Sequence, residues 1–137
     1  MTTIKATKGE FVNLINGLFQ VQDLKGKKFS LSVSKNIKVL QKELKDLEKA
    51  GKPTDEFLAL AEKVNTIANE DSEDSKAKIL ALEEDNKDLV EDRRKQIEDV
   101  TIMMEDKTSI KLELISENVL PEDITAKQIN NIEKIIK

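Results

Sequence analysis

The side chains best able to act chemically in this sequence are lysines and carboxylates, because the chain has no histidine and no cysteine. Without histidine it lacks the commonest general base and a common metal ligand near neutral pH. Without cysteine, neither a disulfide nor a thiolate metal site can form. Carboxylate pairs occur throughout, but no pattern places two of them in an apolar pocket that would separate their pKa values. We therefore expect no catalytic residues, no cofactor and no enzymatic activity.

The most polar stretch is residues 69–75, NEDSEDS, which contain no apolar residue. Asp71, Glu73 and Asp74 could offer oxygen ligands to calcium. An EF-hand loop, however, needs a central glycine and a glutamate at its twelfth position, and neither occurs in register. We interpret residues 70–75 as a polar loop that reverses the chain, and we expect no metal site.

A row of lysines is the most regular charged feature of the chain. In residues 34–52 the lysines alternate by three and four positions, so they share one side of a helix. Such a surface suits an anionic partner: an acidic protein face, nucleic acid or lipid headgroups. The alternative is a solvated outer face, because Glu43, Asp46 and Glu48 lie close enough to offset much of the charge. The candidate contact residues are Lys35, Lys38, Lys42, Lys45 and Lys49.

The formal net charge of −4 is distributed unevenly along the chain. Residues 1–52 carry 11 lysines against 5 acidic residues, whereas residues 70–106 carry 6 basic and 14 acidic residues. Two such arms attract each other when they fold antiparallel, and the same polarity could join copies head to tail. The acidic arm is a second candidate contact surface, represented by Asp85, Asp88, Glu91 and Asp92.

Apolar spacing predicts the helices that hold these charges. Within the lysine-rich run, four apolar residues follow the three–four spacing of a heptad seam; they are Ile37, Leu40, Leu44 and Leu47. Similar spacing continues to residue 69 and returns in the acidic arm. We expect one mainly α domain built on an antiparallel, coiled-coil-like hairpin of long helices. Its predicted parts are a short helix at 7–25, an arm at 31–69 bent near 51–53, the 70–75 loop, a returning helix at 75–105, and a strand with a C-terminal helix at 108–137.

Short local signals indicate where the helices begin and end. Thr7 and Glu10 fit a capping box, and Gly26 is expected to supply a positive φ after the first helix. Thr54 follows Pro53 and restarts the arm as an N-cap. The second helix is expected to take its N-cap from one of three serines, Ser30, Ser32 or Ser34.

Polar residues interrupt the seam of the returning helix. Asn86 and Arg93 occupy a positions and Gln96 a d position. Polar a residues weaken a coiled coil but fix its register and partner number, so we assign this role to Asn86 and Arg93. Arg93 could instead reach a carboxylate with its long side chain. In a further alternative, these residues form a polar recognition patch with Arg94.

The spacing changes near residues 109–115, where three apolar residues alternate with polar ones as in a half-buried strand. This strand has two candidate partners: a hairpin with residues 100–104, or an edge strand from residues 2–5. Beyond it, Thr125 and Gln128 fit another capping box, and isoleucines at helical spacing predict a helix running to residue 137. That helix either packs into the core or docks into a partner.

Three stretches together resemble a group of small, largely uncharacterised proteins of tailed bacteriophages and prophages. They are residues 6–57, the charged run DNKDLVEDRRKQIEDV, and residues 110–136. Those proteins tend to carry a longer polar insert in the middle, where this chain has only NEDSEDS, so no role that rests on the insert is transferred. The resemblance implies a phage origin and carries no catalytic residues.

Three functions from different classes follow. The leading hypothesis is a non-enzymatic phage protein that acts by protein–protein interaction, as a virion component or assembly factor, with a phage or host protein or another copy as partner. The second is an inhibitor of a host defence or nucleic-acid enzyme, whose acidic helix mimics nucleic acid. Nucleic-acid binding by the lysine row ranks third, because the pI is about 5.1 and stacking aromatics are few.

The expected location is the host cell cytoplasm or the virion. No apolar run approaches the roughly 20 residues of a membrane span. The N-terminal segment MTTIKATKGE also lacks the apolar region of a signal peptide. We therefore expect no membrane partner, and nothing in the sequence indicates a small-molecule substrate.

Overall fold

The computed structural model describes residues 1–70 and 72–137. Within them the chain is mainly α, as predicted, with seven α-helices and a two-stranded antiparallel sheet. Its contacts gather into two compact units: unit 1 is Met1–Glu48 with Ile102–Lys137, and unit 2 is Lys49–Thr101. The single-domain prediction stays a prediction, because compact units of this kind can belong to one domain or to two. The elements are β1 Thr2–Thr7, α1 Lys8–Val21, α2 Lys27–Glu43, α3 Lys45–Gly51, α4 Asp55–Asn69, α5 Ser75–Asp85, α6 Lys87–Met104, β2 Lys107–Leu112, η1 Glu117–Val119, α7 Ala126–Asn131 and η2 Glu133–Ile135.

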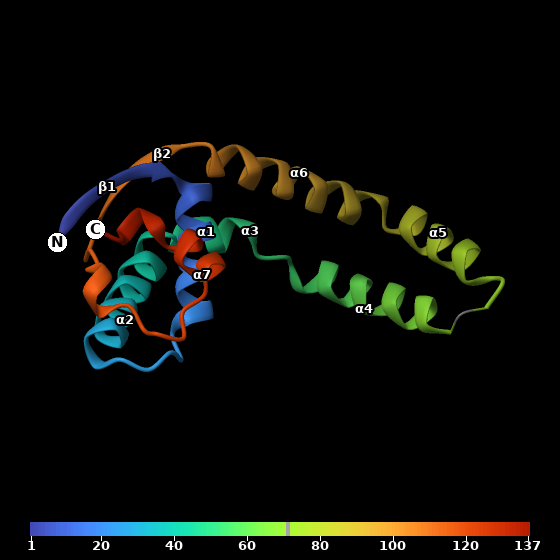
Figure 1. Cartoon of the computed structure of the whole chain (residues 1–137). Helices are drawn as coiled ribbons and strands as arrows, with labels where there is room; N and C mark the ends of the chain where they lie inside the picture. The colour runs from blue at the N-terminus through green and yellow to red at the C-terminus, as the bar shows by residue number, and fades with distance from the viewer. Residues whose placement is uncertain (71) are drawn as a thin grey trace. The chain divides into compact units, whose positions relative to one another are not determined.

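The sheet of unit 1 pairs the N-terminal strand with a strand late in the sequence (Figure 1). Strand β1 pairs antiparallel with β2, with Ile4 opposite Ile110. Of the two candidate partners for the late strand, the edge strand near residues 2–5 is therefore correct. The hairpin with residues 100–104 is wrong, because those residues lie in α6. Their apolar side chains fit a helical face as well as a strand, and the helix also satisfies its own backbone hydrogen bonds.

Helix α1 begins where the capping signal predicted. The Thr7 hydroxyl accepts the N–H of Glu10, and the Glu10 carboxylate accepts the N–H of Thr7. Gly26 has a φ of 139°, which confirms the predicted positive φ. The serine caps are wrong, because α2 begins directly after Gly26, without a side-chain cap. The tight turn brings the chain into helical geometry before the serines are reached.

The apolar seam of α2 and α3 lies in the core of unit 1. Ile37, Leu40, Leu44 and Leu47 are all buried, as the heptad spacing predicted, and so is Val33 one turn earlier. Helix α2 packs against α1 and β2. Because a helix and a strand cover the seam together, its side chains are enclosed on more sides than a single helix could enclose them.

The C-terminal segment packs on the core of unit 1, but it is not helical to its end as predicted. Thr125 caps α7 in the predicted box with Gln128, but α7 ends at Asn131 and a single 3-10 turn follows. The N–H of Ile115 then donates to the carbonyl of Ile135 at 2.7 Å, in a parallel bridge beside Ile136. Ile132 and Ile135 are fully buried, so this segment packs into the core.

Unit 2 consists of two antiparallel arms. Helix α4 packs against α5 (Figure 1), and Arg93 of α6 lies over the ring of Phe57 in α4. Thr54 caps α4 after Pro53, as predicted. The returning arm is broken at Asn86, which separates α5 from α6. The predicted 70–75 loop includes Asp71, which lies outside the described residues, as does the calcium alternative that used it.

Candidate interaction surfaces

The predicted lysine row is exposed along its whole length. Lys35, Lys38 and Lys42 lie on the outer side of α2 and Lys45 begins α3, all in unit 1; Lys49 belongs to unit 2. Glu43, Asp46 and Glu48 are exposed as well, so acidic side chains are interspersed among the lysines. The row is therefore accessible to a partner. The surface that it presents is of mixed charge, however, and not purely basic.

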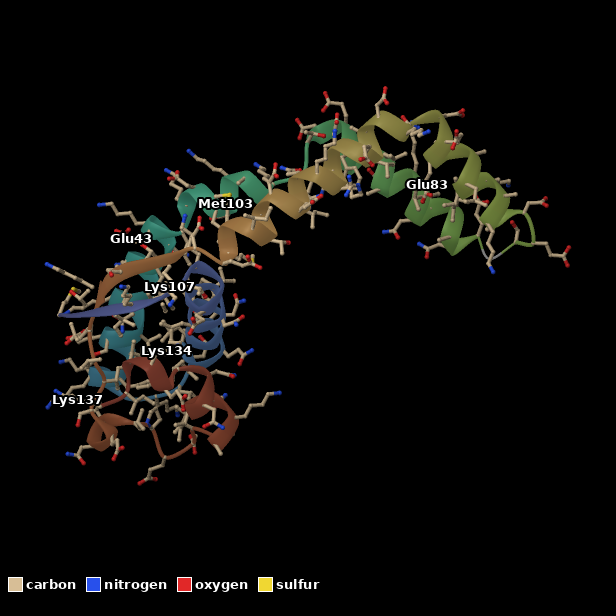
Figure 2. The ribbon with its side chains drawn as sticks, turned by 90° about the horizontal axis from the view of Figure 1, so that it is seen from above. Glu43, Glu83, Met103, Lys107, Lys134 and Lys137 are labelled. Atoms are coloured by element: carbon tan, nitrogen blue, oxygen red, sulfur yellow. The ribbon has the colours of Figure 1, made fainter. Side chains whose placement is uncertain are left out.

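A shallow groove of about 300 Å³ lies beside the first lysine of this row. Lys28, Lys35 and Lys137 line it together with Glu113. The Lys35 ammonium lies 3.9 Å from the Glu113 carboxylate, so part of the groove's positive charge is offset within unit 1. Figure 2 labels Lys137 at the end of the chain. With three lysines against one glutamate, the groove keeps a net positive charge.

Asn36 is the residue that sequence reasoning missed beside this groove. It is fully buried, and its amide nitrogen donates to the Glu113 carbonyl at 2.9 Å while its oxygen accepts the Glu113 N–H at 2.8 Å. The side chain thus pairs with the backbone just after β2 in the way that a neighbouring strand would. The available signal was an uncharged amide between Lys35 and Ile37, on a helix whose exposed polar residues are mostly lysines.

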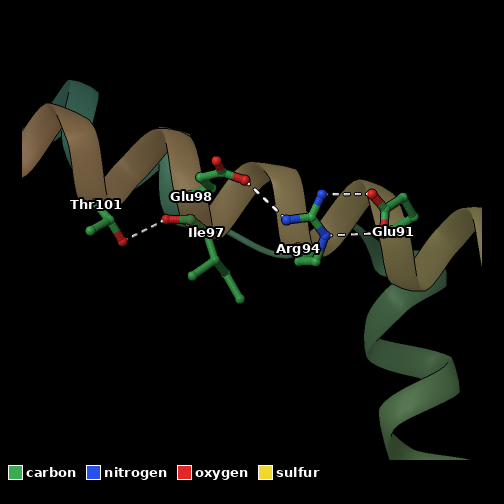
Figure 3. A network of polar contacts seen from close by, with 5 residues as sticks. All are labelled: Glu91, Arg94, Ile97, Glu98 and Thr101. Atoms are coloured by element: carbon green, nitrogen blue, oxygen red, sulfur yellow. Dashed lines mark hydrogen bonds and ion pairs between the residues drawn. The ribbon is translucent and has the colours of Figure 1, made fainter.

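The acidic candidates cluster around the junction of α5 and α6. Asp85, Asp88, Glu91 and Asp92 are all exposed. Glu91 is already engaged, because Arg94 donates two hydrogen bonds to its carboxylate at 2.7 and 3.1 Å and also reaches Glu98 (Figure 3). The Arg94 hydrogen bond lowers the pKa of Glu91, and the two carboxylates raise the pKa of Arg94. The structure thus holds part of this acidic surface in internal ion pairs.

The two residues assigned to register, Asn86 and Arg93, occupy different positions in unit 2. The Asn86 amide donates to the Leu82 carbonyl of its own arm at 2.8 Å, at the helix break. Arg93 donates to the Gly51 carbonyl at 2.9 Å and to Gln96. Gln96 in turn donates to two carbonyls near the end of α3, Ala50 and Lys52. Arg93 and Gln96 therefore cap α3, and their role in setting register stays a prediction.

Ion pairs account for the pKa shifts of the described residues. The shifted pKa values belong to exposed ion pairs: Glu91, Arg94, and Glu10, whose pKa is lowered first by its hydrogen bond to Lys134. The Lys134 ammonium, on the residue labelled in Figure 2, lies 2.7 Å from the Glu10 carboxylate and thereby joins η2 to α1. Over residues 1–70 and 72–137, no group of three or more potential metal ligands comes together.

Comparisons with known proteins gave no match that would indicate a function. The chain matches no protein-family model, no curated protein and no solved structure. In the part of the chain that the structure describes, no helix has both the length and the apolar character to cross a membrane.

Proposed function

We propose that this chain is a non-enzymatic bacteriophage protein that acts by binding other proteins, as a virion component or assembly factor. The phage assignment rests on the resemblance in the sequence. The mode of action rests on one observation in unit 2. Leu60 is the one apolar side chain buried in its described residues, whereas Leu58, Leu80 and Ile97 are exposed. A helix pair that leaves large apolar side chains in water is suited to contact another protein.

We further infer that the two arms form a coiled-coil-like hairpin. The half-buried residues of both arms follow heptad spacing, which supports this inference. Such a hairpin offers a partner a long, regular surface rather than a pocket.

The test of this function is the composition and assembly of phage particles. The gene is deleted in the phage or prophage that encodes it, and the deletion is complemented in trans by the wild-type chain as the control. We expect either the chain itself in purified particles by mass spectrometry, or a loss of normal particles on deletion. Particles that lack the chain and assemble normally without it would overturn the proposal.

A second candidate function is inhibition of a host nucleic-acid enzyme by the acidic surface. Three exposed aspartates, Asp85, Asp88 and Asp92, lie near one helix junction, which favours a charge mimic. Affinity purification from infected cells distinguishes the two. One host enzyme at stoichiometric amounts supports inhibition, whereas phage structural proteins support assembly.

A further inference from the structure

The exposed apolar side chains of unit 2 are not scattered around its arms. The described residues that pack between the arms recur at heptad spacing, and a second row follows one residue after them on each arm. On α4 this second row, here called the small row, is Leu58, Ala61, Asn65 and Ala68. On α5 and α6 the corresponding row, here called the bulky row, is Leu80, Glu83, Lys87, Val90, Arg94, Ile97 and Thr101.

Every large apolar side chain that the described residues of unit 2 expose falls in one of these rows. The exposed fractions are 48% for Leu58, 66% for Leu80, 37% for Val90 and 51% for Ile97. Two antiparallel helices are related by a half-turn about an axis perpendicular to both, so equivalent heptad positions of the two helices share a face. The small and bulky rows therefore lie on one side of the hairpin.

The two rows are complementary in size. The bulky row presents branched side chains, Leu80, Val90 and Ile97, whereas Ala61 and Ala68 leave space on α4. In helix packing, a large side chain inserts between residues of the facing helix, and small residues let the helices approach closely. The bulky row of one hairpin thus fits the small row of another hairpin better than it fits a second bulky row.

The two rows are also complementary in charge. The bulky row carries Lys87 and Arg94 against one acid, Glu83, so it is basic on balance. The small row carries no charge itself, but Asp55 and Glu62 lie one helical turn on either side of Leu58 and are exposed. The opposite side of the returning arm is lined by aspartates and repels its own copy; they are Asp85, Asp92 and Asp99.

We propose that two copies of the chain associate through this face, with the small row of each copy against the bulky row of the other. The product is a four-helix bundle with two-fold symmetry, in which every contact occurs twice. Association buries the side chains that a single hairpin leaves in water. This inference stands apart from the proposed function, since a dimer can form whatever else the protein binds.

The first test compares the mass of the full-length chain with that of a variant of the bulky row. We expect the wild-type chain to be dimeric by light scattering at micromolar concentration. The double substitution Val90→Glu and Ile97→Glu should raise the dimer dissociation constant at least tenfold, because it places carboxylates in the interface. Since both side chains are exposed within one chain, its helix content by circular dichroism should be unchanged.

The matched control adds the same charges to the other side of the hairpin. Ala59 and Ala81 are exposed and lie outside both rows, so Ala59→Glu with Ala81→Glu should leave the dimer intact. A wild-type chain that is monomeric throughout the concentration range would overturn the proposal. A dimer that resists the bulky-row variant, or that dissociates equally in the control, would overturn it too.

The second test uses charge reversal to check which rows meet. Lys87 is preferred to Arg94 because Arg94 is held by Glu91 and Glu98. Glu62→Lys places a lysine opposite Lys87 of the other copy, and Lys87→Glu places a glutamate opposite its Glu62. Each variant alone should therefore dimerise more weakly, because like charges meet in the interface. Mixed in equal amounts, they should form a heterodimer that restores the affinity. Recovery supports the pairing of small and bulky rows, and a mixture no tighter than its components contradicts it.

Discussion

Leu18 and Leu60 are the same residue type in two different surroundings. Leu18 of α1 is fully buried in unit 1, where α1 packs with α2, β1 and α7. Leu60 of α4 is 6% exposed, but the seam residues on either side of it, Phe57 and Val64, are only half-buried. A helix surrounded by several elements can enclose a side chain completely, whereas two helices meet along one line. Unit 1 therefore encloses its apolar side chains more completely than unit 2 does.

The sharpest test of this difference is the same truncation in both units. We expect Leu18→Ala to lower the free energy of unfolding by about 3–5 kcal/mol, because it leaves a cavity that its neighbours cannot fill. Leu60→Ala should cost roughly half as much, because the open seam relaxes and admits water. Chemical denaturation, monitored by amide hydrogen exchange in each unit, measures both losses of unfolding free energy. Equal losses would remove the distinction between the units.

The next largest effect is expected at Asn36. Asn36→Ala leaves the N–H and the carbonyl of Glu113 without their partner, which should cost about 2–4 kcal/mol. Ser34→Ala, an exposed substitution on the same helix, is the control and should be nearly neutral. Thermal or urea unfolding measures the difference. A loss below that of the control would show that the two bonds contribute nothing net.

The glycines of the two units should respond in opposite directions. A Cβ at Gly17 would lie 2.9 Å from the Cβ of Asn131, so α1 and α7 would have to separate. Gly17→Ala should therefore lower stability by about 1–3 kcal/mol. A Cβ at Gly51 would meet Val100 at an ordinary 3.7 Å. Gly51→Ala should be neutral or stabilising by up to ~1 kcal/mol, since alanine favours a helix. Equal destabilisation by both in urea unfolding would contradict the contrast.

The smallest expected effect is the pH dependence of one ion pair in unit 1. The pKa of Glu10 is lowered from its ordinary 4.5, first by the hydrogen bond from Lys134 and then by the Thr7 N–H. A lowered pKa in the folded state means that the contribution is present above 4.5 and is lost as the pH falls through the folded value. The stability difference between wild type and Glu10→Gln should therefore shrink towards acid pH.

An NMR titration of the Glu10 carboxyl checks the cause of this shift. Lys134→Met should move the pKa of Glu10 back towards its ordinary value, because it removes the first hydrogen bond. Lys137→Met, in the same segment but not bonded to Glu10, is the matched control. An unchanged pKa in Lys134→Met would show that the Thr7 cap alone lowers it.

Local signals in the sequence determined the ends of several elements. The capping boxes at Thr7 and Thr125, the cap at Thr54 and the turn at Gly26 all depend on residues within four positions of each other. Such interactions are set by side-chain chemistry and backbone geometry, whatever surrounds them. The heptad spacing likewise identified Ile37 and Leu40 of α2 as buried, although not Asn36.

Only the tertiary structure decided what each buried face meets. The α2 seam packs on α1 and β2, and the late strand pairs with residues over a hundred positions earlier. Spacing in a sequence shows that a face is apolar but not which of several apolar faces covers it. Asn36 illustrates the same limit, because its partner Glu113 lies 77 residues away and a backbone partner leaves no mark on the sequence. The surfaces for other chains depend on such choices, since they consist of the faces that the fold leaves uncovered.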